Sequence, residues 1–140
     1  MADADPDCIF CKIVAGELPS ERVAEDEHTV AFMDISPATR GHALVVPRRH
    51  AQDLLAIEPE ELAATMRAAQ RLARRAVAEL GADGVNLINS CGASAWQTVF
   101  HFHVPVSPRY VGDPLKLPWT PSPGDLDEIA ATARTLRADG

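Results

Sequence analysis

Apolar side chains recur at helical spacing in one long stretch of this chain. Between positions 58 and 80 they lie three or four residues apart, at Leu62, Met66, Ala69, Leu72, Ala73, Ala76, Val77 and Leu80. Pro59 stands in the first turn and Gly81 just past the end, where each residue type is favoured. This pattern predicts a long helix from Glu58 to Leu80.

Shorter apolar segments have the composition of strands and are bounded by turn residues. They are RVAEDEHTVAFMD at 22–34, which predicts two strands around an acidic turn, HALVVP at 42–47, GVNLIN at 84–89 and TVFHFHVPV at 98–106. A second helical pattern covers residues 124–140, with Asp125 or Asp127 near its start, where negative charge is stabilising.

Strands gathered around one main helix predict an α+β fold with a mainly antiparallel sheet of about five strands, one long helix and a C-terminal helix. The length of 140 residues fits one domain over 1–140, with a core at about 8–109 and an extension at 110–140. No apolar run approaches eighteen residues, and the N-terminus lacks a secretory pattern, so we expect a cytoplasmic protein with no membrane partner.

The charge balance limits the partners. A formal net charge of −7 argues against nucleic acid, because phosphate-backbone binding draws on a basic face. A small phosphate ester is still compatible with this charge, since a few well-placed donors are enough to bind it.

Two histidines stand one residue apart in the stretch QTVFHFHVPVSPRY. In a strand, His101 and His103 project from one face while Phe102 and Val104 pack on the other. Two imidazoles on one face can bind a metal, share a proton or attack phosphorus. An isolated pair of this kind is more often a half-buried edge strand with two outward polar residues.

Two cysteines, Cys8 and Cys11, are separated by two residues. In a cytosolic chain this spacing favours metal or redox chemistry over a structural disulfide, and the absence of a βαβ context disfavours redox. The alternative is two small hydrophobic residues in an N-terminal turn. Two thiolates are half of a tetrahedral zinc site, and His50 with either His101 or His103 could complete it.

Taken in order, the motifs resemble those of the histidine triad (HIT) family. The matching segments are CIFCKIVAGELPS, EDEHTVAFMDISPATRGHALVVPRRH, INS and QTVFHFHVPVSPR, and they span most of residues 8–109. The resemblance implies an α+β protomer in a homodimer joined through a shared sheet, with the helix at 58–80 and the GVNLIN strand at the contact. It also implies binding of a purine nucleotide or nucleoside phosphate ester and chemistry at its α-phosphate.

The resemblance assigns roles to individual residues. His103 matches the nucleophile that takes the nucleotidyl group, and His42 matches a histidine near the active centre that could orient it, or it is simply a partly buried histidine. The phosphate is expected at Gln97, Thr98 and Val99. The base and ribose are expected at Phe10, Ile13, Leu18, Phe32, Asp34, Ile35 and Asn89, with core packing as the alternative for each apolar member.

The third histidine of the family falls on Pro105, which has no side-chain donor and no backbone N–H. A branch resembling galactose-1-phosphate uridylyltransferase also lacks it, remains catalytic and holds zinc. The zinc ligands of that branch fall on Cys8, Cys11, His50 and His101, which implies a structural Zn²⁺. A proline in a strand also predicts a local edge or irregularity of the sheet at Pro105.

Two functions follow from this reading. The first is a hydrolase or nucleotidyl transferase that acts on a nucleoside phosphoramidate, an adenylate or a dinucleoside polyphosphate through a covalent nucleotidyl-histidine. The second is a zinc-stabilised nucleotide-binding or interaction protein with little or no catalysis, because Pro105 replaces the third histidine.

Overall fold

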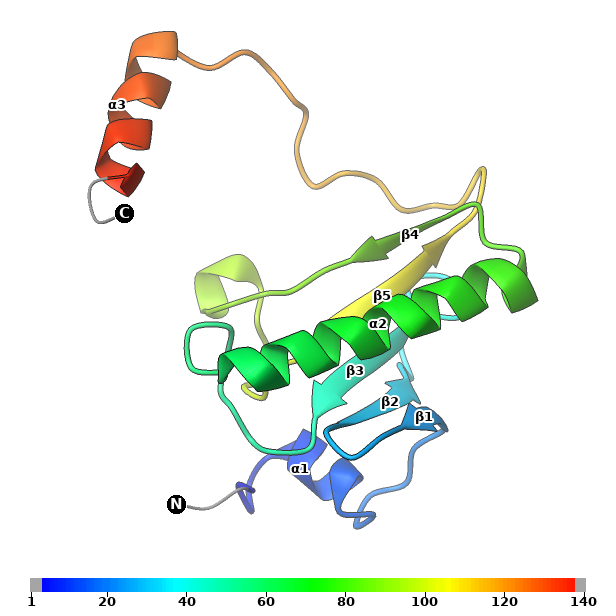
Figure 1. Cartoon of the computed structure of the whole chain (residues 1–140). Coiled ribbons are helices and arrows are strands. Elements are labelled where there is room, and N and C mark those ends of the chain that lie inside the picture. The colour runs from blue at the N-terminus through cyan, green and yellow to red at the C-terminus, as the bar shows by residue number, and fades with distance from the viewer. Residues whose placement is uncertain (1–3, 138–140) are drawn as a thin grey trace.

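The fold is built on a five-stranded sheet with the order β1-β2-β3-β5-β4, in which every neighbouring pair is antiparallel (Figure 1). A computed structural model describes residues 4–137. The strands are β1 Arg22–Glu25, β2 Thr29–Met33, β3 Ala43–Pro47, β4 Gly84–Leu87 and β5 Val104–Arg109. The helices are α1 Ile9–Val14, α2 Pro59–Leu80 and α3 Leu126–Arg137, with a short 3₁₀ turn, η1, at Ala93–Ala95. The predicted α+β class, the strand number and the two predicted helices are confirmed.

The long helix α2 ends where the sequence predicts. Pro59 occupies its first turn, and Gly81 caps its end in the left-handed conformation, with φ of 68°. Its sheet-facing side carries small buried residues, among them Ala64, Ala69 and Ala76, so the helix axis can approach the sheet closely.

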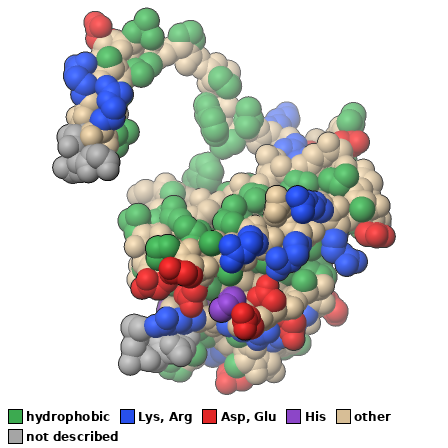
Figure 2. Space-filling model, viewed as in Figure 1, with side chains coloured by type: hydrophobic (Ala, Val, Ile, Leu, Met, Phe, Trp, Pro, Cys, Tyr) green, Lys and Arg blue, Asp and Glu red, His purple; other side chains and the backbone are tan. Residues whose placement is uncertain are grey.

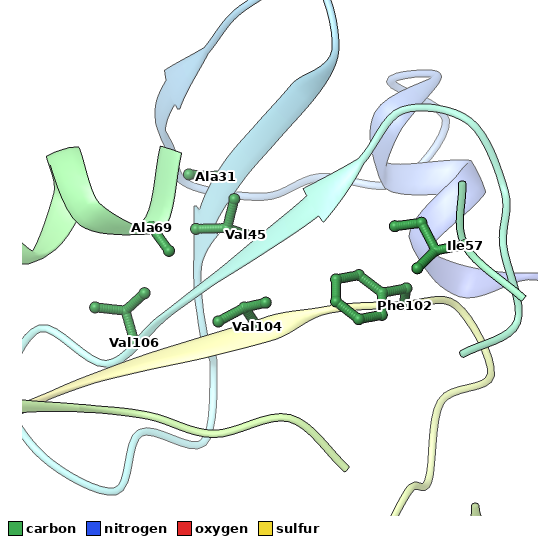
Figure 3. Close-up of a cluster of buried hydrophobic side chains, with 7 residues drawn as sticks. All are labelled: Ala31, Val45, Ile57, Ala69, Phe102, Val104 and Val106. Carbon is green, nitrogen blue, oxygen red and sulfur yellow. The ribbon is translucent and has the colours of Figure 1, made fainter. Parts of the chain in front are cut away.

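Both faces of the central strands are buried. One cluster lies between α2 and the sheet and consists of Ala31, Val45, Ile57, Ala69, Phe102, Val104 and Val106 (Figure 3). On the opposite face α1 contributes to a second cluster, Phe10, Ile13, Val30, Phe32, Leu44 and Val46. Burial on both faces explains why β2 and β3 read as nearly continuous apolar runs rather than as a clean alternation of apolar and polar residues.

One expectation about the histidine segment needs correction. The last strand begins at Val104 rather than at residue 98, so His101 and His103 precede β5. Phe102 nevertheless points into the core, and its N–H donates to the carbonyl of Ala51, so the alternation of sides persists without a strand ladder.

The irregularity expected at Pro105 is local: β5 lies between β3 and β4 and is not an edge strand, but the ladder with β4 ends at the pair of Leu87 and Val106. Pro105 is in register with Leu44 of β3. Its carbonyl accepts from the N–H of Ile88, just beyond the end of β4. In an extended antiparallel strand the N–H and C=O of one residue face the same neighbour. The missing N–H therefore falls where β4 has already ended, and no ladder bond between β3 and β5 is lost.

Beyond β5 the chain leaves the sheet and leads to α3, which stands away from the other elements (Figure 1). Asp125 and Asp127 lie at its start, as predicted, and Asp125 also caps the helix, because its Oδ1 accepts from the N–H groups of Asp127 at 2.8 Å and Glu128 at 3.3 Å. Among the described residues, no helix combines the length and apolar character needed to cross a membrane.

The close approach of Gly41 to α2 gives a test of the packing. Gly41 has φ of +89°, and a Cβ there would lie 2.5 Å from Leu80 Cδ1. Gly41→Ala should lower the free energy of unfolding by about 2–4 kcal/mol, from left-handed strain plus overpacking. Gly16→Ala is the matched control, because its φ is +81° and no atom lies within 4 Å of the added Cβ. Urea unfolding measures both, and equal losses would contradict the proposed steric contact.

Candidate functional site

Four potential ligand residues converge from three parts of the chain. The first turn of α1 supplies Cys8 and Cys11, and Cys8 Sγ accepts from the Cys11 N–H at 3.3 Å, which holds the two thiols together. His50 follows β3, and His101 precedes β5. One possible ligand atom from each of the four lies within 4.8 Å of all the others.

The separations in this cluster fit a tetrahedral cation. His101 Nδ1 lies 3.4 Å from Cys8 Sγ, 3.5 Å from Cys11 Sγ and 3.2 Å from His50 Nδ1. The remaining short separation, Cys11 Sγ to His50 Nδ1, is 3.4 Å. Four bonds of about 2.0–2.3 Å in tetrahedral geometry place their ligand atoms roughly 3.3–3.8 Å apart. The donor set and its spacing therefore suit a metal ion, as the sequence predicted.

The main chain fixes the direction of the His101 ring. Its Nε2 lies 2.9 Å from the carbonyl oxygen of Pro47, and a carbonyl can only accept, so Nε2 carries the proton. The Nδ1 lone pair then points into the cluster, which is the orientation that a metal ligand needs.

Burial disfavours the charged forms of the side chains in this cluster unless a cation is bound. It raises the pKa of the Cys11 thiol to about 11 and lowers the pKa of His101 to about 4. Both residues are therefore held in their neutral forms by the protein alone. A bound divalent cation would reverse this for the thiol, because metal coordination deprotonates it.

His103 is held in a different direction from His101. Its Nδ1 donates to the carbonyl oxygen of His101 at 2.7 Å, which leaves Nε2 with a lone pair. The Phe10 ring packs edge-on against it with centroids 5.1 Å apart, and the Asn89 amide donates to its carbonyl at 3.0 Å. Burial lowers the pKa of His103, and the opposing effects of the His101 carbonyl and the Asp34 charge do not offset it.

His42 lies beside Asp34 rather than in hydrogen-bond contact with His103. Its Nδ1 accepts from the N–H of Ala38 at 2.9 Å, so Nε2 carries the proton and faces Asp34 Oδ2 at 3.6 Å. Within the described part of the chain this buried Nε2 has no hydrogen-bond partner. The Asp34 carboxylate thus faces His42 and also acts on His103 through its charge.

The loop before the histidines is braced by Gln97. Its side chain accepts from the N–H of Gly92 and donates to the carbonyls of Gln52 and Val99, so both ends of the amide are occupied. Within residues 4–137, the N–H groups of Thr98, Val99 and Phe100 form no hydrogen bond. The structure therefore offers backbone donors at the predicted phosphate segment, while the Gln97 side chain shapes the loop.

The structure places the residues predicted to surround a base and ribose in three different environments. Phe10, Ile13 and Phe32 belong to the buried cluster under α1, with Leu18 and Val99 packed at its margin. Ile35 is 96% exposed and packs in no core cluster of the described residues. Asp34 and Asn89 lie near His103, as described above.

Sequence reasoning missed two main-chain acceptors of this site, the carbonyls of Pro47 and His101. They orient the two histidine rings. Every residue has a carbonyl, so no residue type marks these positions. The contact of Asn89 with the His103 carbonyl was also missed, although an amide close to the histidines in the expected sheet is a signal that could have suggested it.

This chain is similar to known proteins over most of its length. The HIT domain matches residues 15–112. The protein named Protein hit from Bacillus subtilis (strain 168) is 40% identical over 131 residues, which are 89% of this chain and 90% of that protein.

Solved structures extend the likeness to the fold. The crystal structure of SMU.412c from Streptococcus mutans UA159 has a TM-score of 0.93 at 37% identity, covering 99% of this chain and 88% of that one, so the overlap extends through α3. A Zn-bound histidine triad family protein from Mycobacterium smegmatis has a TM-score of 0.76 at 40% identity, covering 96% and 98% of the two chains. The domain match and these relatives show that this chain belongs to the HIT family.

Proposed function

We propose that this protein is a nucleotide-binding hydrolase or nucleotidyl transferase that acts at an α-phosphate through His103. The observation that carries the proposal is the hydrogen bond from His103 Nδ1 to the His101 carbonyl at 2.7 Å. It fixes the ring so that the Nε2 lone pair is the free one, and a neutral imidazole with a fixed lone pair is suited to nucleophilic attack. Membership of the HIT family supports a nucleotide as the substrate.

The chemistry proceeds in two displacements. Nε2 of His103 attacks the α-phosphorus of a nucleoside phosphoramidate, adenylate or dinucleoside polyphosphate, and the bond from phosphorus to the leaving group breaks. The N–H groups of Thr98, Val99 and Phe100 are available for the charge on the phosphoryl oxygens. Water or a second acceptor then attacks the nucleotidyl-histidine, loses a proton and releases the nucleotide product with His103 restored.

Asp34 is suited to hold the ribose. Its carboxylate is partly buried near His103, and a carboxylate accepts hydrogen bonds from two adjacent hydroxyl groups. The Nε2–H of His42 faces this carboxylate at 3.6 Å.

One observation favours the enzyme over a binding protein without catalysis, although Pro105 replaces the third histidine. The bond that orients His103 goes to the His101 carbonyl and does not involve position 105, and Pro105 keeps the register of β5 with β3. Replacement of the third histidine therefore leaves the proposed nucleophile in place.

We also propose that the four-residue cluster holds zinc. Two thiols and two imidazoles are the donor set of a closed structural zinc site, and the separations fit it. If bound, zinc would be held by Cys8, Cys11, His50 and His101 and would compensate the charge of the two thiolates. Through Cys8 and Cys11 the cluster ties α1 to the segments that bear His50 and His101.

The proposed zinc site predicts a metal content of about one Zn²⁺ per chain. Cys8→Ser should lose the metal and at least ~2 kcal/mol of unfolding free energy, because metal binding is coupled to folding. Cys91→Ser is the matched control, since Cys91 is a free cysteine outside the cluster. Elemental analysis and chemical denaturation measure both effects. Less than about a tenth of an equivalent of zinc in the wild-type protein would rule the site out.

The proposed nucleophile predicts that His103→Ala loses at least ~10³-fold in turnover, because only binding and electrostatic stabilisation remain. The zinc content should stay near the wild-type value. His28→Ala is the control, since that histidine is 55% exposed in the acidic turn. Rapid quench with a labelled nucleoside phosphoramidate should trap a nucleotidyl adduct only when His103 is present. If His103→Ala keeps more than about a tenth of wild-type turnover, the assignment fails.

We further propose a homodimer joined at β4 and α2. β4 is an edge strand, and apolar side chains around it are exposed on both elements, including Met66 and Val77 of α2 and Leu87 of β4. A hollow between α2 and β4 is lined by Met66, Arg67, Gln70, Ala73, Val85 and Leu87. A two-fold axis at this edge would pair β4 with its copy and cover these side chains.

The dimer is tested by placing a charge at its centre. Leu87→Arg should convert a dimer at micromolar concentration into a monomer, because the charge would be buried without a partner. Ile9→Arg is the control, since Ile9 is also about half exposed but lies on α1, on the other face of the sheet. Light scattering gives the masses. A wild-type monomer, or a Leu87→Arg dimer of undiminished strength, would contradict the proposed interface.

A further inference from the structure

The helix α3 has an apolar face that nothing covers within the described residues. Leu126, Ile129, Ala133 and Leu136 are spaced three or four apart, and the three large side chains among them are 80%, 54% and 80% exposed in that order. An isolated helix of twelve residues is marginal in water, since most helix stability comes from packing of such a face. Figure 2 shows that the part of the chain that carries α3 projects from the rest of the molecule, with hydrophobic side chains along it.

The start of the arm, residues 110–125, is fixed in direction. Arg109 binds both carboxylate oxygens of Asp113, at 2.8 and 2.7 Å, and the carbonyl of Leu115 at 3.1 Å. Asp113 also accepts from the N–H of Tyr110. Four prolines then follow, Pro114, Pro118, Pro121 and Pro123, and they favour an extended, semi-rigid chain. The arm therefore leads α3 away from its own body rather than back onto it.

A matching hollow lies under the C-terminal half of α2. It has a volume of about 440 Å³ and is lined by apolar side chains that include Val23, Met33, Leu72, Ala76, Leu80 and Val106. Arg40, Arg75 and Glu79 also line it. The face of α3 is apolar too, and the helix carries Asp127 and Glu128 in its first turn and Arg134 and Arg137 in its last. The arginines and the glutamate at the hollow could therefore each pair with side chains of opposite charge on α3.

The direction of the arm points to a second copy of the chain as the occupant. In Figure 1 the arm starts near the C-terminal end of α2, passes the β4 edge and carries α3 toward the side of the α2 N-terminus. A two-fold axis at the β4 edge would place the partner's α2 antiparallel to this one. The C-terminal half of the partner's α2, with the hollow under it, would then lie beyond that edge on the same side as α3. The superposition on the Streptococcus mutans crystal structure extends through α3, so the outward arm occurs in a solved relative.

We propose that α3 of each copy seats its apolar face in the hollow of the other copy, so that two chains exchange C-terminal arms. This rests on the dimer proposed above and adds to it a second contact, separate from the one between β4 and α2. The exchange covers the face of Leu126, Ile129 and Leu136 and closes the hollow beside Leu72 and Leu80.

Two alanines of α3 provide a matched pair of variants. Ala133 lies on the apolar face, and Ala131 lies on the opposite face. Ala133→Asp should weaken the dimer at least ~10-fold, as expected from burying one unpaired charge. Ala131→Asp carries the same charge and the same cost in helix propensity, and it should leave dimer affinity within about 3-fold of the wild type. Light scattering over a dilution series gives the dissociation constants.

Hydrogen exchange of the α3 amides identifies what covers the helix. Protection of residues 126–137 should be present in the dimer, be lost on dilution to monomers, and be lost in Ala133→Asp but not in Ala131→Asp. Equal behaviour of the two variants, or unprotected α3 in a wild-type dimer, would overturn the arm exchange while leaving the dimer at β4 and α2 intact. Protection that survives in monomers would mean that α3 covers its own body, and it would also overturn the proposal. A wild-type protein that is monomeric throughout would overturn both contacts.

Discussion

The convergence of two thiols and two imidazoles at the junction of α1, β3 and β5 is the constraint on which the site depends. His101 makes two kinds of contact at this junction. Its side chain faces Cys8 and Cys11, while its carbonyl accepts from His103. The buried cluster therefore fixes the backbone that orients the proposed nucleophile. The candidate metal cluster and the proposed nucleophile are thus linked through a single residue, His101.

Much of the fold was predictable because its signals are local and periodic. The apolar repeat, the early proline and the final glycine define α2 without tertiary information. The two strands β2 and β3 were found from composition. The start of β5 was not, because residues 98–103 have strand composition but are bent to bring His101 into the cluster. The six-residue helix α1 was also missed, since its formation depends on packing against the sheet.

The site residues likewise fall into those that the sequence could identify and those that it could not. Thiols and imidazoles are marked by residue type, so Cys8, Cys11, His50 and His101 could be grouped from sequence, and the structure brings them together. The side-chain role expected of Gln97 could not be judged from sequence, because its three bonds go to backbone groups of the loop and its surroundings. Likewise, Phe10 combines core packing against Phe32 with a contact to His103, and only coordinates separate those contributions.

Pro105 also determines where the ladder between β4 and β5 stops. Its nitrogen cannot donate, so pairing ends after a single bond from Ile88, and the chain is free to leave the sheet. The loop from residue 88 to 100 begins at that point and is braced from within by Gln97. Insertions or deletions near Ser94 would consequently change the length of this loop without shifting the register of the sheet. The rim of the site can thus vary in size independently of the scaffold that carries His103.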